Sequence, residues 1–271
     1  MISIAATIHP SHAAISRHEA SNRRTGAIPS PLRVKGCVRW YNSSNIETIR
    51  GQSFDRVVCA GVSAVKWLAN KEPERDWQGI QRLMDSLASV SARSFVLIST
   101  IDVYRESAGM TECDTPPVEG LHPYGLHRLR LEAFVAERFP NHSIVRLPAL
   151  FGTGLKKNAI FDLLHDNMTD KIVPNAAFQW YPTRRLGDDL DRIARAGPRL
   201  INVTSEPVTM ATIRDRLFPG VAIGAAVASP PLYDLRTVHD TVLGGRGGYH
   251  LAAAEVLAEL TNFVESERGA R

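Results

Sequence analysis

The most constraining feature of the chain is an apolar run, residues 95–98 (FVLI), that ends in the hydroxyl side chains of Ser99 and Thr100. A short apolar run of this kind is typical of a strand that is buried on both faces of a parallel sheet. Further along the chain, Tyr124 opens a helical pattern. Because ligands of open α/β sheets gather at the carboxyl ends of the strands, we expect Thr100 and Tyr124 to meet in one site.

The helical pattern also places a fixed cation beside the phenol, because Tyr124 and Arg128 are four positions apart on one helix face. A free phenol has a pKa of about 10, so a base near neutral pH needs that pKa brought down to about 7. Arg128 is expected to lower the pKa of Tyr124 in part. Thr100 would hold a substrate oxygen while Tyr124 moves a proton, which suits the oxidation of an alcohol or the reduction of a ketone.

Each of these residues has a plainer interpretation. Thr100 is a possible cap of the turn after its strand, and Asp102 is either a second acid/base or a residue that stabilises the same turn. The Tyr-x-x-x-Arg spacing recurs at Tyr181 and Arg185, where no strand-end hydroxyl precedes it at a comparable distance. The context of Tyr124, rather than the spacing alone, therefore carries the prediction.

Apolar periodicity and chain-breaking residues predict alternating strands and helices. Such alternation favours an α/β fold with a doubly wound parallel sheet, and the segments after Gly152 are expected to form most of a smaller substrate-binding part. The expected strands are residues 56–59, 95–99, 143–147, 172–173 and 200–203, and the expected helices are residues 76–89, 123–139, 160–167, 187–196, 209–217 and 253–266.

Several segments resemble the extended short-chain dehydrogenase/reductase family, in its sugar-nucleotide epimerase, dehydratase and reductase branch. They occur in the family's order and cover most of the chain after residue 46. The segments are residues 54–61 (FDRVVCAG), similar to the fourth strand and its small-residue turn; residues 99–104 (STIDVY), similar to the Ser-Ser-x-x-Val-Tyr signature; the acidic, proline-bearing loop 111–125; residues 144–152 (IVRLPALFG); and residues 201–203 (INV).

The resemblance implies a Rossmann-like, NAD(P)-binding fold with NAD or NADP as the cofactor and a nucleotide-sugar as the small-molecule substrate. It implies three sets of site residues. The catalytic set is Thr100, Tyr124 and Arg128; the cofactor-binding set is Cys59, Ala60, Gly61, Ser99, Arg128 and Pro148; the substrate-binding set is Asp102, Asn158 and Arg185. Relatives often pair through two long helices, so a homodimer is also expected.

Two departures from the family pattern bear on the cofactor. The family motif is Tyr-x-x-x-Lys, whereas this chain has Arg128, a planar cation that stays charged and relays protons poorly. The family also begins with a strand and a Gly-x-x-Gly-x-x-Gly turn that admits the pyrophosphate to a helix N-terminus. Residues 1–50 contain only Gly26 and Gly36. The glycine motif is thus degenerate, and the phosphate cradle is expected to be missing.

The first 40 residues are rich in Arg and poor in acids. This composition fits a transit peptide, but we favour the interpretation that a family-type first strand and glycine turn have been lost or replaced. The expected organisation is a divergent, poorly packed basic segment at residues 1–40, a Rossmann-like dinucleotide-binding core at residues 41–152, and a mainly substrate-binding part with returning sheet strands at residues 153–271.

Composition excludes several other classes of protein. The net charge of +4 comes largely from the basic first segment, and no aromatic-interleaved basic stripe accompanies it, which argues against nucleic acid as a partner. Three cysteines without Cys-x-x-Cys spacing indicate reduced thiols and a cytoplasmic protein, and no metal site is expected. No apolar run is long enough to span a membrane.

Two classes of function remain open. The first is an NAD(P)-dependent oxidoreductase, epimerase or dehydratase that acts on a nucleotide-sugar or a related alcohol or ketone, with Tyr124 as acid/base. The second is a catalytically inactive relative that keeps the fold as a ligand-binding or partner-binding module, because the glycine turn and the lysine are both absent.

Overall fold

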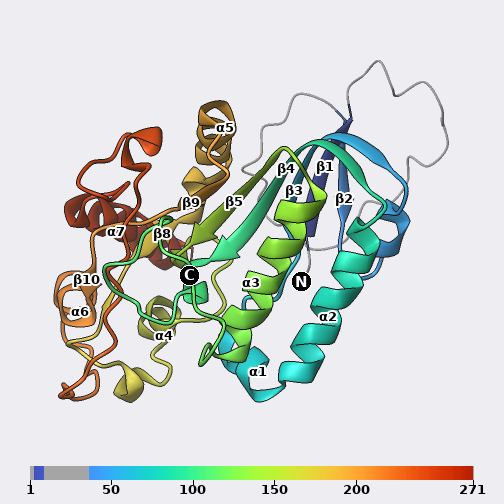
Figure 1. Ribbon diagram of the computed structural model, residues 1–271. Coiled ribbons are helices and arrows are strands. Elements are labelled where there is room, and N and C mark those ends of the chain that lie inside the picture. The colour runs from blue at the N-terminus through green and yellow to red at the C-terminus, as the bar shows by residue number, and fades with distance from the viewer. Residues whose placement is uncertain (1–2, 9–36, 271) are drawn as a thin grey trace.

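Figure 1 shows the computed structural model, which describes residues 3–8 and 37–270 of the chain. Its central element is a six-stranded sheet with the strand order β2-β1-β3-β4-β5-β9. The four strands from β3 to β9 run parallel to one another, which confirms the predicted α/β class. The strands are β1 (Ser3–Ile8), β2 (Cys37–Tyr41), β3 (Ser53–Ala60), β4 (Ser91–Thr100), β5 (His142–Leu147) and β9 (Leu200–Asn202).

Side chains from both faces of the parallel strands are buried under helices, as in a doubly wound sheet. Phe95 and Leu97 of β4 join α2 and α3 in one apolar cluster, whereas Val96 joins α5 in another. Successive side chains of β4 thus alternate between two cores. The longer helices are α2 (Pro73–Leu87), α3 (Pro123–Arg138), α5 (Leu186–Ala196) and α7 (Ala253–Gly269), and the shorter ones are α1 (Lys66–Lys71), α4 (Ala159–His165) and α6 (Met210–Leu217).

The chain after β5 builds a second region beside the sheet (Figure 1). β6 (Ala149–Phe151) pairs with β8 (Trp180–Pro182), and β7 (Ala177–Phe178) pairs with β10 (Val208–Thr209). One apolar cluster runs from Val145 of the sheet to Val256 of α7, so this region shares its core with the sheet. The predicted strand at residues 172–173 does not form.

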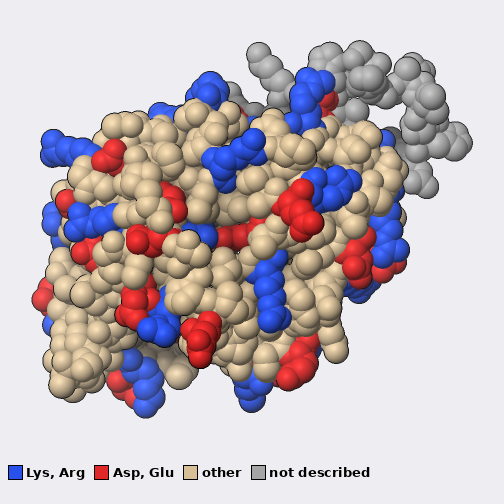
Figure 2. Space-filling view, in the orientation of Figure 1, with Lys and Arg blue, Asp and Glu red and all other residues tan. Residues whose placement is uncertain are grey.

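That strand fails because a turn at Pro174 and Asn175 follows it immediately, and the extended segment begins only at Ala177. The other expected helices and strands form with shifts of a few residues at their ends. In the residues that the structure describes, no helix has the length and apolarity needed to cross a membrane. Figure 2 shows Lys and Arg side chains interspersed with Asp and Glu over the visible face, without a continuous basic stripe.

β1 is the main difference from the expected fold. It lies between β2 and β3 and runs antiparallel to both. Ile4 and Ala6 are completely buried against the helix-covered face of the sheet. The prediction of a poorly packed first segment is therefore wrong for residues 3–8, because even a six-residue strand gains burial and ladder hydrogen bonds beside β3. The rest of that prediction falls on residues 9–36, outside the described residues.

Candidate active site

β4 ends at Thr100, and the chain turns at once into a short 3₁₀ helix, Ile101–Val103. The Thr100 Oγ1 accepts a hydrogen bond from the backbone N–H of Asp102 at 3.1 Å, so Thr100 does cap the turn. The hydroxyl proton of Thr100 remains available for a second partner, because this bond uses only an oxygen lone pair. Thr100 can therefore serve both the turn and a neighbouring phenol or ligand.

Gly125 allows α3 to lie directly on this turn. A Cβ at position 125 would stand 2.3 Å from the carbonyl oxygen of Asp102, closer than real Cβ atoms approach backbone. His122 caps the helix, and its Nδ1 accepts a hydrogen bond from the Gly125 N–H at 3.0 Å. The Tyr124 N–H is bound by the side-chain oxygen of Asn70 at 2.9 Å. The first turn of α3 is thus fixed against the end of β4.

Tyr124 is buried at the contact between these two elements, with 8% of its surface exposed. Burial raises the pKa of the phenol; Arg128, the Thr100 hydroxyl and Lys66 act in the opposite sense, Asp102 raises the pKa further, and the net pKa is raised. Tyr124 therefore keeps its proton at neutral pH. The expectation that Arg128 would turn this phenol into a base near neutral pH is wrong, because burial outweighs the neighbouring charges.

Arg128 lies against the Tyr124 ring, with its guanidinium carbon 3.9 Å from the ring centroid, so the three predicted catalytic side chains are together. The hydrogen bonds of this guanidinium are nevertheless made to other groups of the protein. It binds both carboxylate oxygens of Asp76 on α2, at 2.5 and 2.9 Å, and the Ser63 carbonyl oxygen at 2.6 Å. Only 4% of Arg128 is exposed. This arginine ties three segments together instead of facing a ligand.

The predicted cofactor-binding residues other than Arg128 lie at or just after the ends of β3, β4 and β5. Ala60 and Gly61 lie at the carboxyl end of β3, and Pro148 is buried between β5 and β6. Cys59 faces the helix-side core, and burial raises the pKa of its thiol to about 12, so it stays protonated and packed. The Ser99 hydroxyl donates to Glu132 at 2.5 Å. Both side chains are thus engaged within the protein.

A dinucleotide cradle needs a strand that delivers a turn and a helix N-terminus to the carboxyl edge of the sheet. β1 runs the other way. Ser3 pairs with Ala60, so β1 begins at that edge and ends at the opposite one. Arg128 is also occupied, because Asp76 and Ser63 bind its guanidinium. The described residues therefore do not fit a dinucleotide bound in the way that the resemblance implies. We therefore assign no step to such a cofactor.

A pocket of about 240 Å³ does open next to the carboxyl end of β3. It lies between the turn that follows Gly61 and the helices α1 and α2, and most of its lining is apolar. Asp76, which holds Arg128, is part of its wall. Neither Tyr124 nor Arg128 lines this pocket, although Asp76 and Ser63, two partners of the Arg128 guanidinium, do.

Of the predicted substrate-binding residues, only Asp102 lies at the site. Its carboxylate accepts hydrogen bonds from Lys66 and Tyr233. The Asn158 side chain instead caps α4, accepting from two backbone N–H groups, and donates to the Leu150 carbonyl. Arg185 faces acidic partners, Asp189 at 3.7 Å and Glu259 at 3.9 Å. Arg185 and Asn158 are therefore held by the fold.

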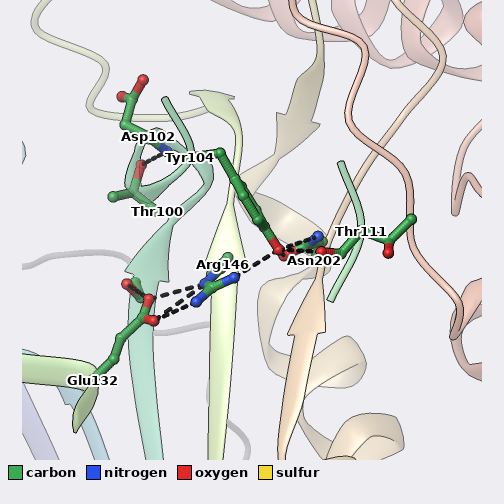
Figure 3. A network of polar contacts seen from close by, with 8 residues as sticks. Thr100, Asp102, Tyr104, Thr111, Glu132, Arg146 and Asn202 are labelled. Atoms are coloured by element: carbon green, nitrogen blue, oxygen red, sulfur yellow. Dashed lines mark hydrogen bonds and ion pairs between the residues drawn. The ribbon is translucent and has the colours of Figure 1, made fainter. Parts of the chain in front are cut away.

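A buried polar network lies beneath the end of β4 (Figure 3). Arg146 of β5 binds Glu132 of α3 through both of its carboxylate oxygens, the shortest contact being 2.6 Å. Arg146 also donates to the Tyr104 hydroxyl at 2.7 Å, and Asn202 of β9 donates to the same oxygen at 3.1 Å. Since Ser99 binds Glu132, this network ties the residue before Thr100 to the helix that carries Tyr124.

Sequence reasoning missed Lys66 and Tyr233. Lys66 begins α1, after the turn that follows β3, and Tyr233 comes from a segment without regular secondary structure. The position of Lys66 shortly after a predicted strand was a usable signal, because that edge collects ligands. No pattern in the sequence points to Tyr233. Within the described ranges, no group of three or more His, Cys, Asp or Glu residues is placed to hold a metal ion.

Comparison with known proteins gives no match at the level of sequence, either to a protein-family model or to a curated protein. Solved structures do match. A UDP-N-acetylglucosamine 4-epimerase from Methanobrevibacter ruminantium, in complex with UDP-N-acetylmuramic acid, superposes with a TM-score of 0.65 at 12% identity over 84% of this chain and 81% of its own. A dTDP-4-dehydrorhamnose reductase from Clostridium acetobutylicum gives 0.65 at 17% identity, over 84% and 86%.

A third structure, MoeE5 in complex with UDP-glucose and NAD, gives a TM-score of 0.61 at 19% identity over 84% of both chains. At such identities the likeness concerns the arrangement of the backbone and not the activity. The agreement covers more than four fifths of this chain in all three comparisons. The chain therefore has the fold of the extended short-chain dehydrogenases/reductases.

Proposed function

We propose that this chain binds a nucleotide-linked sugar, or a related alcohol or ketone, at the carboxyl edge of its sheet and exchanges a proton with it through Tyr124. The observation that carries the proposal is the contact between the first turn of α3 and the end of β4, which Gly125 makes possible and which puts Tyr124 beside Thr100. The shared fold supports the substrate class, since two of the three structures described above contain UDP-linked sugars.

The raised pKa of Tyr124 favours one direction of proton transfer. A protonated phenol is ready to give a proton to a ketone oxygen, whereas it must first lose that proton to act as a base on an alcohol. Thr100 would orient the same oxygen by donating its hydroxyl proton. The favoured chemistry is therefore donation of a proton to a ketone oxygen of the bound ligand, which is the part of a reduction that these residues supply. No hydride transfer is assigned, because the described residues do not fit a dinucleotide.

A second candidate function has its own support. β1 is antiparallel to β3, and Arg128 is bound by Asp76 and Ser63, so the described residues offer no dinucleotide seat of the usual kind. These observations favour a catalytically inactive relative that binds a sugar-type ligand or a partner without oxidising or reducing it.

Calorimetric titration of the full chain separates these possibilities. UDP-glucose is expected to bind, and Thr100→Val and Tyr124→Phe are expected to weaken binding without a large change in melting temperature. Absence of UDP-glucose binding would contradict the proposed substrate class. NAD⁺, NADH, NADP⁺ and NADPH are titrated in parallel. Micromolar binding of one of them supports the oxidoreductase, and no binding at millimolar concentration supports the inactive alternative.

A further inference from the structure

Three side chains form a closed triangle at the candidate active site. The Lys66 Nζ lies 2.7 Å from the Asp102 Oδ1 and 3.2 Å from the Tyr233 hydroxyl oxygen. The Tyr233 hydroxyl donates to the same Asp102 oxygen at 2.9 Å. The three residues come from three separate segments of the chain: the start of α1, the turn after β4, and the region that follows α6.

Two corners of this triangle are firmly held. Asp102 belongs to the turn that Thr100 caps, through the hydrogen bond from its backbone N–H. Tyr233 stacks on Phe178, with ring centroids 5.6 Å apart, and its backbone N–H donates to the Ala177 carbonyl at 2.9 Å. Lys66 is the adaptable corner, since 38% of its side chain is exposed. The fold thus places a partly solvated ammonium against a fixed carboxylate.

The charged and titratable groups that face Tyr124 come from several elements. α3 contributes Arg128, the cap of α3 contributes His122, the turn after β4 contributes Asp102, and α1 contributes Lys66. The charge of Arg128 is already balanced by Asp76. Burial lowers the pKa of His122, which accepts from Gly125 as the neutral ring. Asp102 and Lys66 remain, and they act in opposite senses on the phenol.

We propose that Lys66 is a positioning residue of this site that acts through Tyr124: its ammonium offsets the negative charge of Asp102 beside the phenol. Without Lys66, Asp102 would stand next to Tyr124 as an uncompensated carboxylate and make release of the phenol proton harder. This inference rests on the proposed role of Tyr124 as the proton-transfer residue, but it does not depend on the identity of the ligand. A partly exposed ion pair of this kind contributes little to stability. We therefore assign to Lys66 an electrostatic effect on the phenol and not a role in holding the fold together.

The test measures the ionisation of the phenol itself. A difluorotyrosine, whose phenol ionises closer to neutral pH, replaces tyrosine at position 124 of the full chain, and fluorine NMR follows its titration. Lys66→Met is expected to raise the apparent pKa of this phenol by about 1, as for loss of a nearby opposite charge. Lys66→Arg keeps the charge and is expected to leave the titration near that of the wild type.

Two further variants keep the inference open to refutation. Lys66→Met combined with Asp102→Asn removes both charges and is expected to bring the apparent pKa back toward the wild-type value. Lys71→Met, at an exposed position of the same helix, is the matched control and is expected to change nothing. If Lys66→Met lowers the melting temperature but leaves the phenol titration unchanged, Lys66 is only a structural link and the inference is wrong. That result would not touch the proposed function, which the ligand titrations of Thr100 and Tyr124 variants test separately.

Discussion

The carboxyl edge of the sheet has two halves that differ in completeness. At the end of β4, Thr100, Asp102 and Tyr124 are packed together over a buried polar network with few unused donors. At the end of β3, the adjoining strand β1 runs in the opposite direction, and a turn of main chain at Ser63 covers Arg128. Local packing therefore holds in place the half that we propose transfers a proton, although the described residues do not provide the half that would seat a dinucleotide.

The largest expected effect comes from breaking the network under the first half. Glu132→Ala leaves the buried guanidinium of Arg146 without its carboxylate, and we expect a loss of about 3 to 5 kcal/mol in the free energy of unfolding. Glu47→Ala removes an exposed partner of Arg82 and is the matched control, with an expected change below about 1 kcal/mol. Urea denaturation measures both, and equal effects would show that the network does not support the site.

The next substitution tests whether Arg128 stabilises the fold or takes part in the reaction. Lysine cannot reproduce the two-pronged contact with Asp76, so Arg128→Lys is expected to cost about 1.5 to 3 kcal/mol of stability. Arg130→Lys, at an exposed position of the same helix, should change stability by less than about 0.5 kcal/mol. We expect no gain in ligand turnover from Arg128→Lys. A gain in rate would mean that the arginine is a partial loss of function rather than a structural tie.

Gly125 offers a direct way to separate the two elements of the first half. Gly125→Ala forces its Cβ onto the Asp102 carbonyl, and we expect a loss of about 1 to 3 kcal/mol together with weaker UDP-glucose binding. Gly79→Ala is the matched control on α2, where a Cβ meets nothing within 4 Å, and it should gain about 0.5 to 1 kcal/mol. Unchanged ligand binding in Gly125→Ala would contradict the importance of this contact.

The smallest expected effect is a change in the pH dependence of stability, and it comes from His250, outside the sheet. His250 is buried; its Nδ1 accepts from the Thr204 N–H and its Nε2 donates to the His239 carbonyl, while burial lowers its pKa. Because the folded-state pKa is below the unfolded value of about 6.5, the unfolded chain binds the proton first, and stability should fall as pH drops below that value, by up to about 1.4 kcal/mol per pH unit. His250→Gln should flatten this dependence, whereas His165→Gln at an exposed position should not. An unchanged slope in His250→Gln would contradict the assignment.

Local patterns predicted the first half of the site well, because its elements follow from short-range signals. The apolar run before Ser99 formed β4, and the pattern after Tyr124 formed α3. The juxtaposition of Thr100 and Tyr124 followed from a general rule about parallel sheets. The hydrogen bond of the Ser99 hydroxyl did not follow from any such rule. Its partner, Glu132, lies on α3, two turns after Tyr124.

The second half depends on long-range pairing that no local pattern contains. The direction of β1 is set by its antiparallel ladders with β2 and β3, because a six-residue strand is able to pair in either direction and its own sequence does not specify which. The ion pair that holds the Arg128 guanidinium depends on Asp76, a residue of another helix. Burial, rather than the nearby cation, decides the pKa of Tyr124, and burial at a helix–strand contact emerges only when the elements pack.

If Tyr124 is a protonated acid held beside Thr100, its phenol should not ionise near neutral pH. Tyrosinate absorbance of the wild type minus that of Tyr124→Phe is followed from about pH 6 to about pH 8, well below the usual phenol pKa of about 10. We expect no difference signal over this range, since burial keeps the proton on the phenol. A difference signal that appears near neutral pH would show a phenolate at position 124, and Tyr124 would then not be a protonated acid.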